Sequence, residues 1–268
     1  DRLWITNPEN FGGDGLEYEY LPDGTPTGET IDLHGAGGFW QADGTYNART
    51  GMLWHVDVGE PGCLFEVDPV AKVVTGNTIC GPWESSQRTV THDYATDTYY
   101  VGSTNDTRVF RIDGSGALRG IADLGVTIAG LAYNPTTQHL FVASGFASPF
   151  DVWIFDSVTY AALGGFRVTS NGVPVLQNGG VSLDADCGGR LWINDSSAQT
   201  IYQFESGETG WCVNDIPWLS ESPTEGTVPS GGELPVTVTF DSQGLLPGLH
   251  QGSLLFATDT PGSVDPVP

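Results

Sequence analysis

The chain has 268 residues, enough for one large all-β domain or for a medium domain followed by a small one. It carries 33 acidic and 9 basic residues, a net charge of −24. This charge argues against nucleic acid as a partner and against insertion into or binding to anionic membranes, because both surfaces select clustered Lys and Arg. Disorder is excluded for most of the chain, since apolar and polar residues alternate and eight Trp are present.

A repeated pattern organises the first 215 residues. An apolar strand of five residues ends in a small polar residue, and a second apolar strand ends in Asp; the clearest copy covers residues 140–144 and 152–156. The first strands of the copies begin at Leu3, Leu53, Tyr99, Leu140 and Leu191. A period of about 40–50 residues with strand signals alone predicts a β-propeller, here with five blades, in preference to a meandering β-sandwich.

Each later copy is flanked by two further strands. The preceding strands are rich in Gly and small residues, which suits the innermost position at a crowded channel, and are expected at 38–42, 89–93, 128–133 and 180–184. The following strands are less apolar, as an outer edge should be, and are expected at 28–32, 73–78, 118–122 and 163–168. The first copy begins at its second strand, and the last has its outer strand at 210–213. Either residues before Asp1 supply the remaining inner strand, or the ring closes irregularly.

The four cysteines, Cys63, Cys80, Cys187 and Cys212, show neither CxxC nor zinc spacing and allow three pairings. The local pairs 63–80 and 187–212 each stay within one repeat and are the predicted disulfides. Two disulfides indicate a compartment outside the reducing cytosol. The sequence shows no signal peptide and no transmembrane run. We therefore expect a secreted or cell-surface protein.

The composition changes after Asp215. Residues 234–241, 244–252 and 253–258 alternate as three strands between Gly/Pro turns, which predicts a small immunoglobulin-like β-sandwich. The expected domains are thus 1–215 and 216–268. Such a module should end with a further strand, so an incomplete sheet edge is expected at Pro268. Either the chain is truncated there, or a neighbouring chain donates a strand.

Two resemblances follow from these residues. Residues 217–258 resemble bacterial extracellular immunoglobulin-like modules of the BACON type, through W-L-x-x-S-P from Trp218, V-x-V-x-F-D from Val236 and L-x-P-G from Leu245. The resemblance implies a spacer or adhesive unit without catalytic residues. The propeller resembles extracellular YVTN, NHL and lactonase-like propellers, through 133–135, 140–142 and 152–156. These shared residues identify blades and no activity.

Two sets of loops are expected to meet at one mouth of the channel: those between the second and third strands, and those between blades. Their predicted ligand-binding residues are His34, Asp57, Glu60, Trp83, Glu84, Asn105, Gln177, Asn178, Asn194 and Asp195. The carboxylates that could bind Ca²⁺ are Asp57, Glu60, Asp106 and Asp195. The alternative is that Asn and Asp are simply good turn residues. His92-Asp93 is either a catalytic pair or a hydrogen-bonded turn.

The function favoured by these observations is binding or structural support, with a protein or a carbohydrate at the cell surface as partner. Catalysis is left open. The alternative is a metal-dependent hydrolase or lyase, because lactonase-like propellers hold a divalent metal with such residues and a metal-bound water could hydrolyse an ester. A third interpretation is an accessory region of a larger secreted enzyme.

Overall fold

The computed structural model describes most residues up to Trp211 and short stretches beyond. The described residues are 2–7, 13–34, 41–59, 62–83, 87–144, 149–170, 173–174, 176, 182–186, 188–195, 198, 200–211, 218–223, 226–228 and 231–243. The chain divides into two compact units, Asp1–Val213 and Asn214–Pro268.

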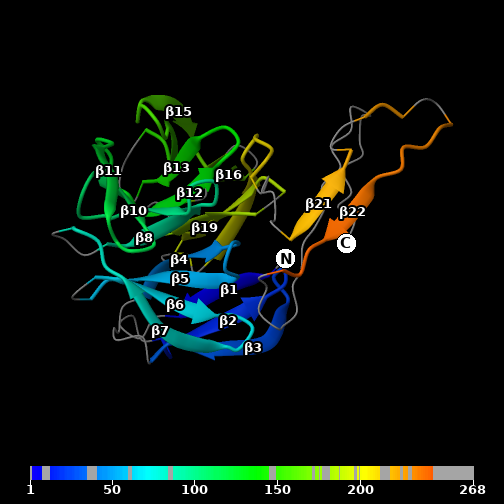
Figure 1. Ribbon diagram of the computed structural model, residues 1–268. Helices are drawn as coiled ribbons and strands as arrows, with labels where there is room; N and C mark the ends of the chain where they lie inside the picture. The colour runs from blue at the N-terminus through cyan, green and yellow to red at the C-terminus, as the bar shows by residue number, and fades with distance from the viewer. Residues whose placement is uncertain are drawn as a thin grey trace. The chain divides into compact units, whose positions relative to one another are not determined.

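Five antiparallel sheets of three or four strands follow one another along the first unit (Figure 1). The first sheet contains β1 (Leu3–Asn7), β2 (Leu16–Tyr20) and β3 (Pro26–Asp32). The second contains β4 (Gln41–Asn47), β5 (Met52–Asp57), β6 (Leu64–Asp68) and β7 (Val73–Ile79). The third contains β8 (Thr89–Asp93), β9 (Thr98–Gly102), β10 (Arg108–Asp113) and β11 (Leu118–Asp123). The fourth contains β12 (Gly130–Asn134), β13 (His139–Ala143), β14 (Val152–Asp156) and β15 (Ala162–Phe166). The fifth contains β18 (Ser182–Ala185), β19 (Arg190–Asp195) and β20 (Thr200–Glu205).

The sheets are arranged as the blades of a propeller. Within each four-stranded sheet, consecutive strands are neighbours from the inner strand to the outer one. The inner strands β4, β8, β12 and β18 pack against one another in chain order, and β18 also approaches β4. The predicted all-β, five-bladed β-propeller is confirmed.

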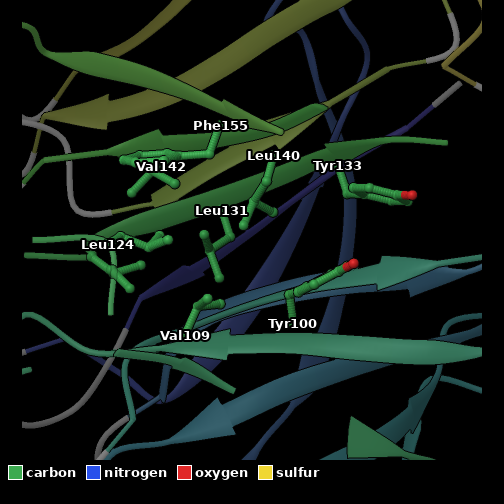
Figure 2. Packing of buried hydrophobic residues seen from close by; sticks show 9 residues of the cluster. Tyr100, Val109, Leu124, Leu131, Tyr133, Leu140, Val142 and Phe155 are labelled. Atoms are coloured by element: carbon green, nitrogen blue, oxygen red, sulfur yellow. The ribbon is translucent and has the colours of Figure 1, made fainter. Parts of the chain in front are cut away.

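Apolar clusters fill the spaces between successive blades. Residues two apart on a strand share a face, so Leu131 and Tyr133 of β12 and Leu140 and Val142 of β13 point the same way. They pack with Tyr100 of the third blade and with other apolar side chains of both blades (Figure 2). Three similar clusters join the first blade to the second, the second to the third and the fourth to the fifth. Each large side chain buried there contributes about 1.5–3 kcal/mol relative to exposure, so these clusters hold each of the joined blades to the next.

Two predicted strands differ in the structure. The inner strand of the second blade, expected at 38–42, is described at Gln41–Asn47, and residues 38–40 lie outside the described part of the chain. Asn47 ends this strand, because its side-chain oxygen accepts the backbone N–H of Arg49 and of Thr50. Of the outer strand expected at 210–213, Trp211 is buried in a turn, and Cys212 and Val213 lie outside the described residues. A two-stranded hairpin of β16 (Thr169–Ser170) and β17 (Val173–Pro174) follows the fourth blade and was not predicted.

Aspartates close many of the turns. Among the described residues, twelve aspartates accept the backbone N–H of the residue two positions later, and their side chains thereby stabilise turns on both faces of the propeller and in the second unit. Equivalent examples in successive blades are Asp68, Asp113 and Asp156, each at the end of a third strand. A large part of the acidity therefore has a structural role in turns.

The second unit shows one antiparallel pair among its described residues. β21 (Leu219–Ser222) pairs with β22 (Thr237–Phe240), and the ring of Trp218 stacks on Phe240 with centroids 6.4 Å apart. The strands expected at 244–252 and 253–258 lie outside the described part of the chain, so the immunoglobulin-like module stays a prediction. Within the described residues, no helix has the length and apolar character needed to cross a membrane.

Candidate binding face at the channel mouth

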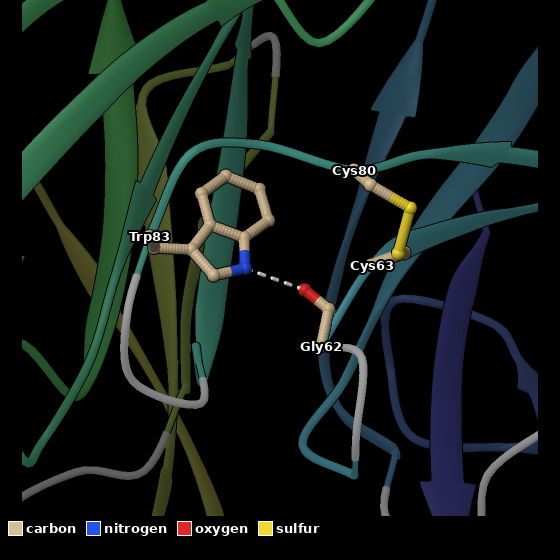
Figure 3. The surroundings of a disulfide bond; sticks show 4 residues. All are labelled: Gly62, Cys63, Cys80 and Trp83. Atoms are coloured by element: carbon tan, nitrogen blue, oxygen red, sulfur yellow. Dashed lines mark hydrogen bonds between the residues drawn. A yellow bond between two sulfur atoms is a disulfide. The ribbon is translucent and has the colours of Figure 1, made fainter.

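A disulfide and a tryptophan brace the connection between the second and third blades. Cys63, just before β6, is bonded to Cys80, just after β7, as predicted from their positions at adjacent strand ends. The indole Nε1–H of Trp83 donates to the carbonyl of Gly62 at 2.8 Å (Figure 3). The segment that enters the third blade is thus attached to the loop that leaves β5. The other predicted pair, Cys187 and Cys212, lies outside the described residues.

Trp83 is packed and is not an open stacking surface. Its ring is partly buried against the cluster between the second and third blades and meets Phe110 edge to face at 6.1 Å. A Cβ atom on residue 81 would lie 2.0 Å from the indole, so this position requires glycine. Trp83, one of the predicted mouth residues, therefore packs between the second and third blades and supports the loop that contains Gly62.

Trp83→Phe should lower the free energy of unfolding by about 1 kcal/mol through the lost hydrogen bond, in addition to the cost of a smaller ring. Urea unfolding followed by far-UV circular dichroism measures this change. Trp4→Phe is the matched control, because Trp4 is also partly buried against a core cluster and no Nε1 hydrogen bond is assigned to it. Equal losses in both variants would show that the Gly62 hydrogen bond contributes nothing.

The described carboxylates of the predicted metal set each serve their own loop. Asp57, only 6% exposed, accepts the Gly59 N–H at 2.8 Å; burial raises the pKa of Asp57, and that hydrogen bond opposes the rise. Asp106 is bonded by the Arg108 guanidinium, which lowers the pKa of Asp106. Asp195 is fully buried and accepts the Ala198 N–H at 3.0 Å.

These carboxylates do not converge on one point. Within the described ranges, no three His, Cys, Asp or Glu side chains are grouped so as to hold a metal ion. Glu60, the fourth predicted ligand, lies outside them. The calcium site therefore stays a prediction, and the described carboxylates do not form the oxygen set that Ca²⁺ requires.

The other predicted mouth residues are dispersed. His34 pairs through Nδ1 with Asp32, and both side chains are exposed. Asn105 is exposed in the turn after β9, where its backbone N–H donates to the Ser103 hydroxyl at 3.1 Å. Asn194 is partly buried in β19, opposite Ser182. The remaining three, Glu84, Gln177 and Asn178, lie outside the described residues.

His92 and Asp93 do not form a pair. His92 Nε2 lies 3.0 Å from Asp97 Oδ1, while Asp93 accepts the Ala95 N–H and is bonded by Arg111. Burial lowers the pKa of His92, and Asp97 only partly opposes this. The geometry favours the hydrogen-bonded turn over the catalytic pair.

Two carboxylates of the inner strands were missed by the sequence reasoning, which searched the loops. Asp43 of β4 accepts a hydrogen bond from the Thr89 hydroxyl of β8. Burial raises the pKa of Asp43 well above its usual range, and Asp184 of β18 adds to the rise. Asp184 is exposed at the surface of β18, although desolvation by the surrounding inner strands raises its pKa to about 7. Burial, followed by the charge of Asp184 in the fifth blade, raises the pKa of Tyr94 in the turn after β8.

These features define a five-bladed β-propeller with a braced mouth and an acidic channel. No protein-family model matches the chain. No curated protein matches it. A chain in the crystal structure of a mitotic checkpoint complex is similar at 13% sequence identity and a TM-score of 0.45, over 72% of this chain and 59% of that one. The comparisons thus assign no family, and the class rests on the sheets themselves.

Proposed function

We propose that this chain is a binding protein that presents the mouth of its propeller to a protein or a carbohydrate at the cell surface. The observation that carries the proposal is the bracing of the mouth loops. Asp57, Asp106 and Asp195 each tie down their own loop, and the Cys63–Cys80 disulfide ties down the next connection. A surface held in one conformation loses little entropy on binding, which favours affinity.

The location and the finer class are part of the same proposal. The disulfide supports a secreted or cell-surface location, because such bonds persist outside the reducing cytosol. The blade motifs support a place among YVTN, NHL and lactonase-like propellers, and the motifs from Trp218 onward support a BACON-type spacer. In this proposal the second unit acts as a spacer for the propeller. A neighbouring chain adds a strand to the sheet of the second unit.

The experiment that tests the binding face uses two substitutions of the same kind. Asn105 is exposed at the predicted mouth, and Val70, 80% exposed, lies in the turn between β6 and β7, at the opposite ends of the strands. Immobilised polysaccharides and surface proteins are screened with the whole chain by biolayer interferometry. For the probe that binds, Asn105→Arg should weaken affinity at least tenfold and Val70→Arg should leave it unchanged.

The two variants also show how the proposal could fail. Weakening by Val70→Arg alone would place the binding face at the other end of the channel. Equal weakening by both would indicate non-specific charge attraction to this acidic protein, and circular dichroism of both variants excludes misfolding as the cause.

A hydrolase or lyase of the lactonase-like group is the second candidate function. The observation that favours it is Asp184, because a carboxyl with a pKa of about 7 inside the channel suits general acid–base catalysis. The described carboxylates do not provide a metal site, so the role supported here is proton transfer by Asp184 itself.

A further inference from the structure

Arg88 is an exception among the basic residues of the chain. The nine basic residues all lie in the described part, and eight have a described partner. Seven form ion pairs with carboxylates: Arg2, Lys72, Arg108, Arg111, Arg119, Arg167 and Arg190. Arg49 donates to the carbonyl of Tyr94 at 3.1 Å. For Arg88, the described residues provide neither an ion pair nor a side-chain hydrogen bond.

The unsatisfied atom of Arg88 is buried. Its Nε is shielded from solvent and has no hydrogen-bond partner. A buried donor without an acceptor destabilises the folded state, and a charged one does so more strongly. In a chain with 33 acidic side chains, a guanidinium without a carboxylate partner calls for a specific explanation.

Arg88 lies at the predicted mouth. It directly precedes the inner strand β8, and its backbone N–H donates to the carbonyl of Gly102, where β9 leads into the loop of Asn105. By strand alternation its side chain lies on the same face as Val90, which packs in the cluster between the second and third blades. Upstream, Trp83 and the disulfide attach the same connection. The backbone that carries Arg88 is therefore held in place at both ends.

The other arginines show what a guanidinium binds in this chain. Nε and Nη2 of Arg108 both donate to one carboxylate oxygen of Asp106, and Arg119 does the same with Asp113. Nε of Arg190 likewise donates to Asp186. Two donors on one side of a planar guanidinium match a carboxylate in geometry and charge.

We infer that Arg88, which is only partly buried, binds a carboxylate group of the ligand at the channel mouth through the accessible part of its guanidinium, while its Nε stays shielded. This deepens the proposed function, on which it rests, by giving the ligand a chemical class. A singly charged carboxylate suits the site better than a phosphate dianion, because the remaining net charge of the protein repels a second negative charge more strongly.

The test follows the Nε–Hε resonance of Arg88 by NMR in the ¹⁵N-labelled whole chain. The resonance is assigned by its loss in Arg88→Lys. Sodium acetate is titrated against sodium chloride at equal ionic strength, and inorganic phosphate is a third series. We expect a saturable shift with acetate at least five times that of the Arg49 Nε–Hε, and a smaller one with phosphate.

Three outcomes would overturn the inference. A shift no larger with acetate than with chloride shows that Arg88 has no free carboxylate site. A larger response to phosphate assigns a different ligand class. If Glu84→Gln alone moves the Arg88 resonance as far as acetate saturation does, the partner is within the chain. The binding face at Asn105 is tested separately, so it could stand if Arg88 fails, and the reverse.

Discussion

Replacing Cys63 and Cys80 together by alanine is expected to lower the free energy of unfolding by about 3 kcal/mol. The bond closes a loop with a sequence separation of 17 residues, and the entropy that it removes from the unfolded chain corresponds to about this value. The folded state also loses support, because the two residues flank the connection that carries Trp83. Urea unfolding of the double variant and the wild type measures the difference.

The effect should extend from the second blade to the third. A Cβ on Gly116, in the turn between β10 and β11, would lie 2.2 Å from the carbonyl oxygen of Cys80. The backbone after β7 is therefore packed closely against the third blade, and its release loosens that contact.

Hydrogen exchange should accordingly increase in both blades while the fourth blade stays protected. Alanine in place of both cysteines is preferable to a reducing agent, which would also reduce the predicted Cys187–Cys212 disulfide. A loss below about 1 kcal/mol would contradict the loop-entropy argument.

Asp184→Asn is expected to stabilise the protein at pH 8 and to have little effect near pH 4. Desolvation raises the folded-state pKa of Asp184 to about 7, above that of an unfolded Asp. Between the two pKa values the folded state binds the additional proton, so the stability of the wild type falls as the pH rises through this window and then levels off. Asparagine carries no charge and keeps an oxygen for the Ala185 N–H, which donates to Asp184 at 2.8 Å.

The expected gain at pH 8 is about 1–2 kcal/mol, a value reduced for solvent screening because the carboxyl retains accessible surface. Melting temperatures between pH 4 and 8 measure it. Glu205→Gln, which removes one exposed charge from β20 of the same blade, is the control for net charge. An equal gain in both variants would assign the effect to general repulsion. The second candidate function also depends on this residue: an esterase activity that survives in Asp184→Asn cannot use it as the proton donor.

Much of the propeller could be predicted from the sequence because its signals are local. Alternation within a strand and the spacing of the copies mark β13 and β14, and they also place Cys63 and Cys80 at adjacent strand ends. The boundary of β4 was missed because Asn47, whose side chain ends that strand, lies beyond the Gly-rich stretch that suggested it.

The candidate site was harder to predict, because the same residue type serves different purposes. From the sequence, Asp57, Asp106 and Asp195 could be either metal ligands or turn residues. In the structure each of them accepts a backbone N–H in its own loop. No local pattern distinguishes Asp43 or Asp184 from the aspartates that close turns, although desolvation raises their pKa values.

The sequence by itself determined the blades, the first disulfide and the acidic character of this protein, since each depends on neighbouring residues or on a regular period. The tertiary structure alone decided which polar groups meet. Thr89 reaches Asp43 across 46 positions, and Glu208 accepts hydrogen bonds from Asn134 and Thr137 of another blade. Such contacts depend on how the blades stack around the channel. The same stacking leaves Arg88 without a partner among the described residues.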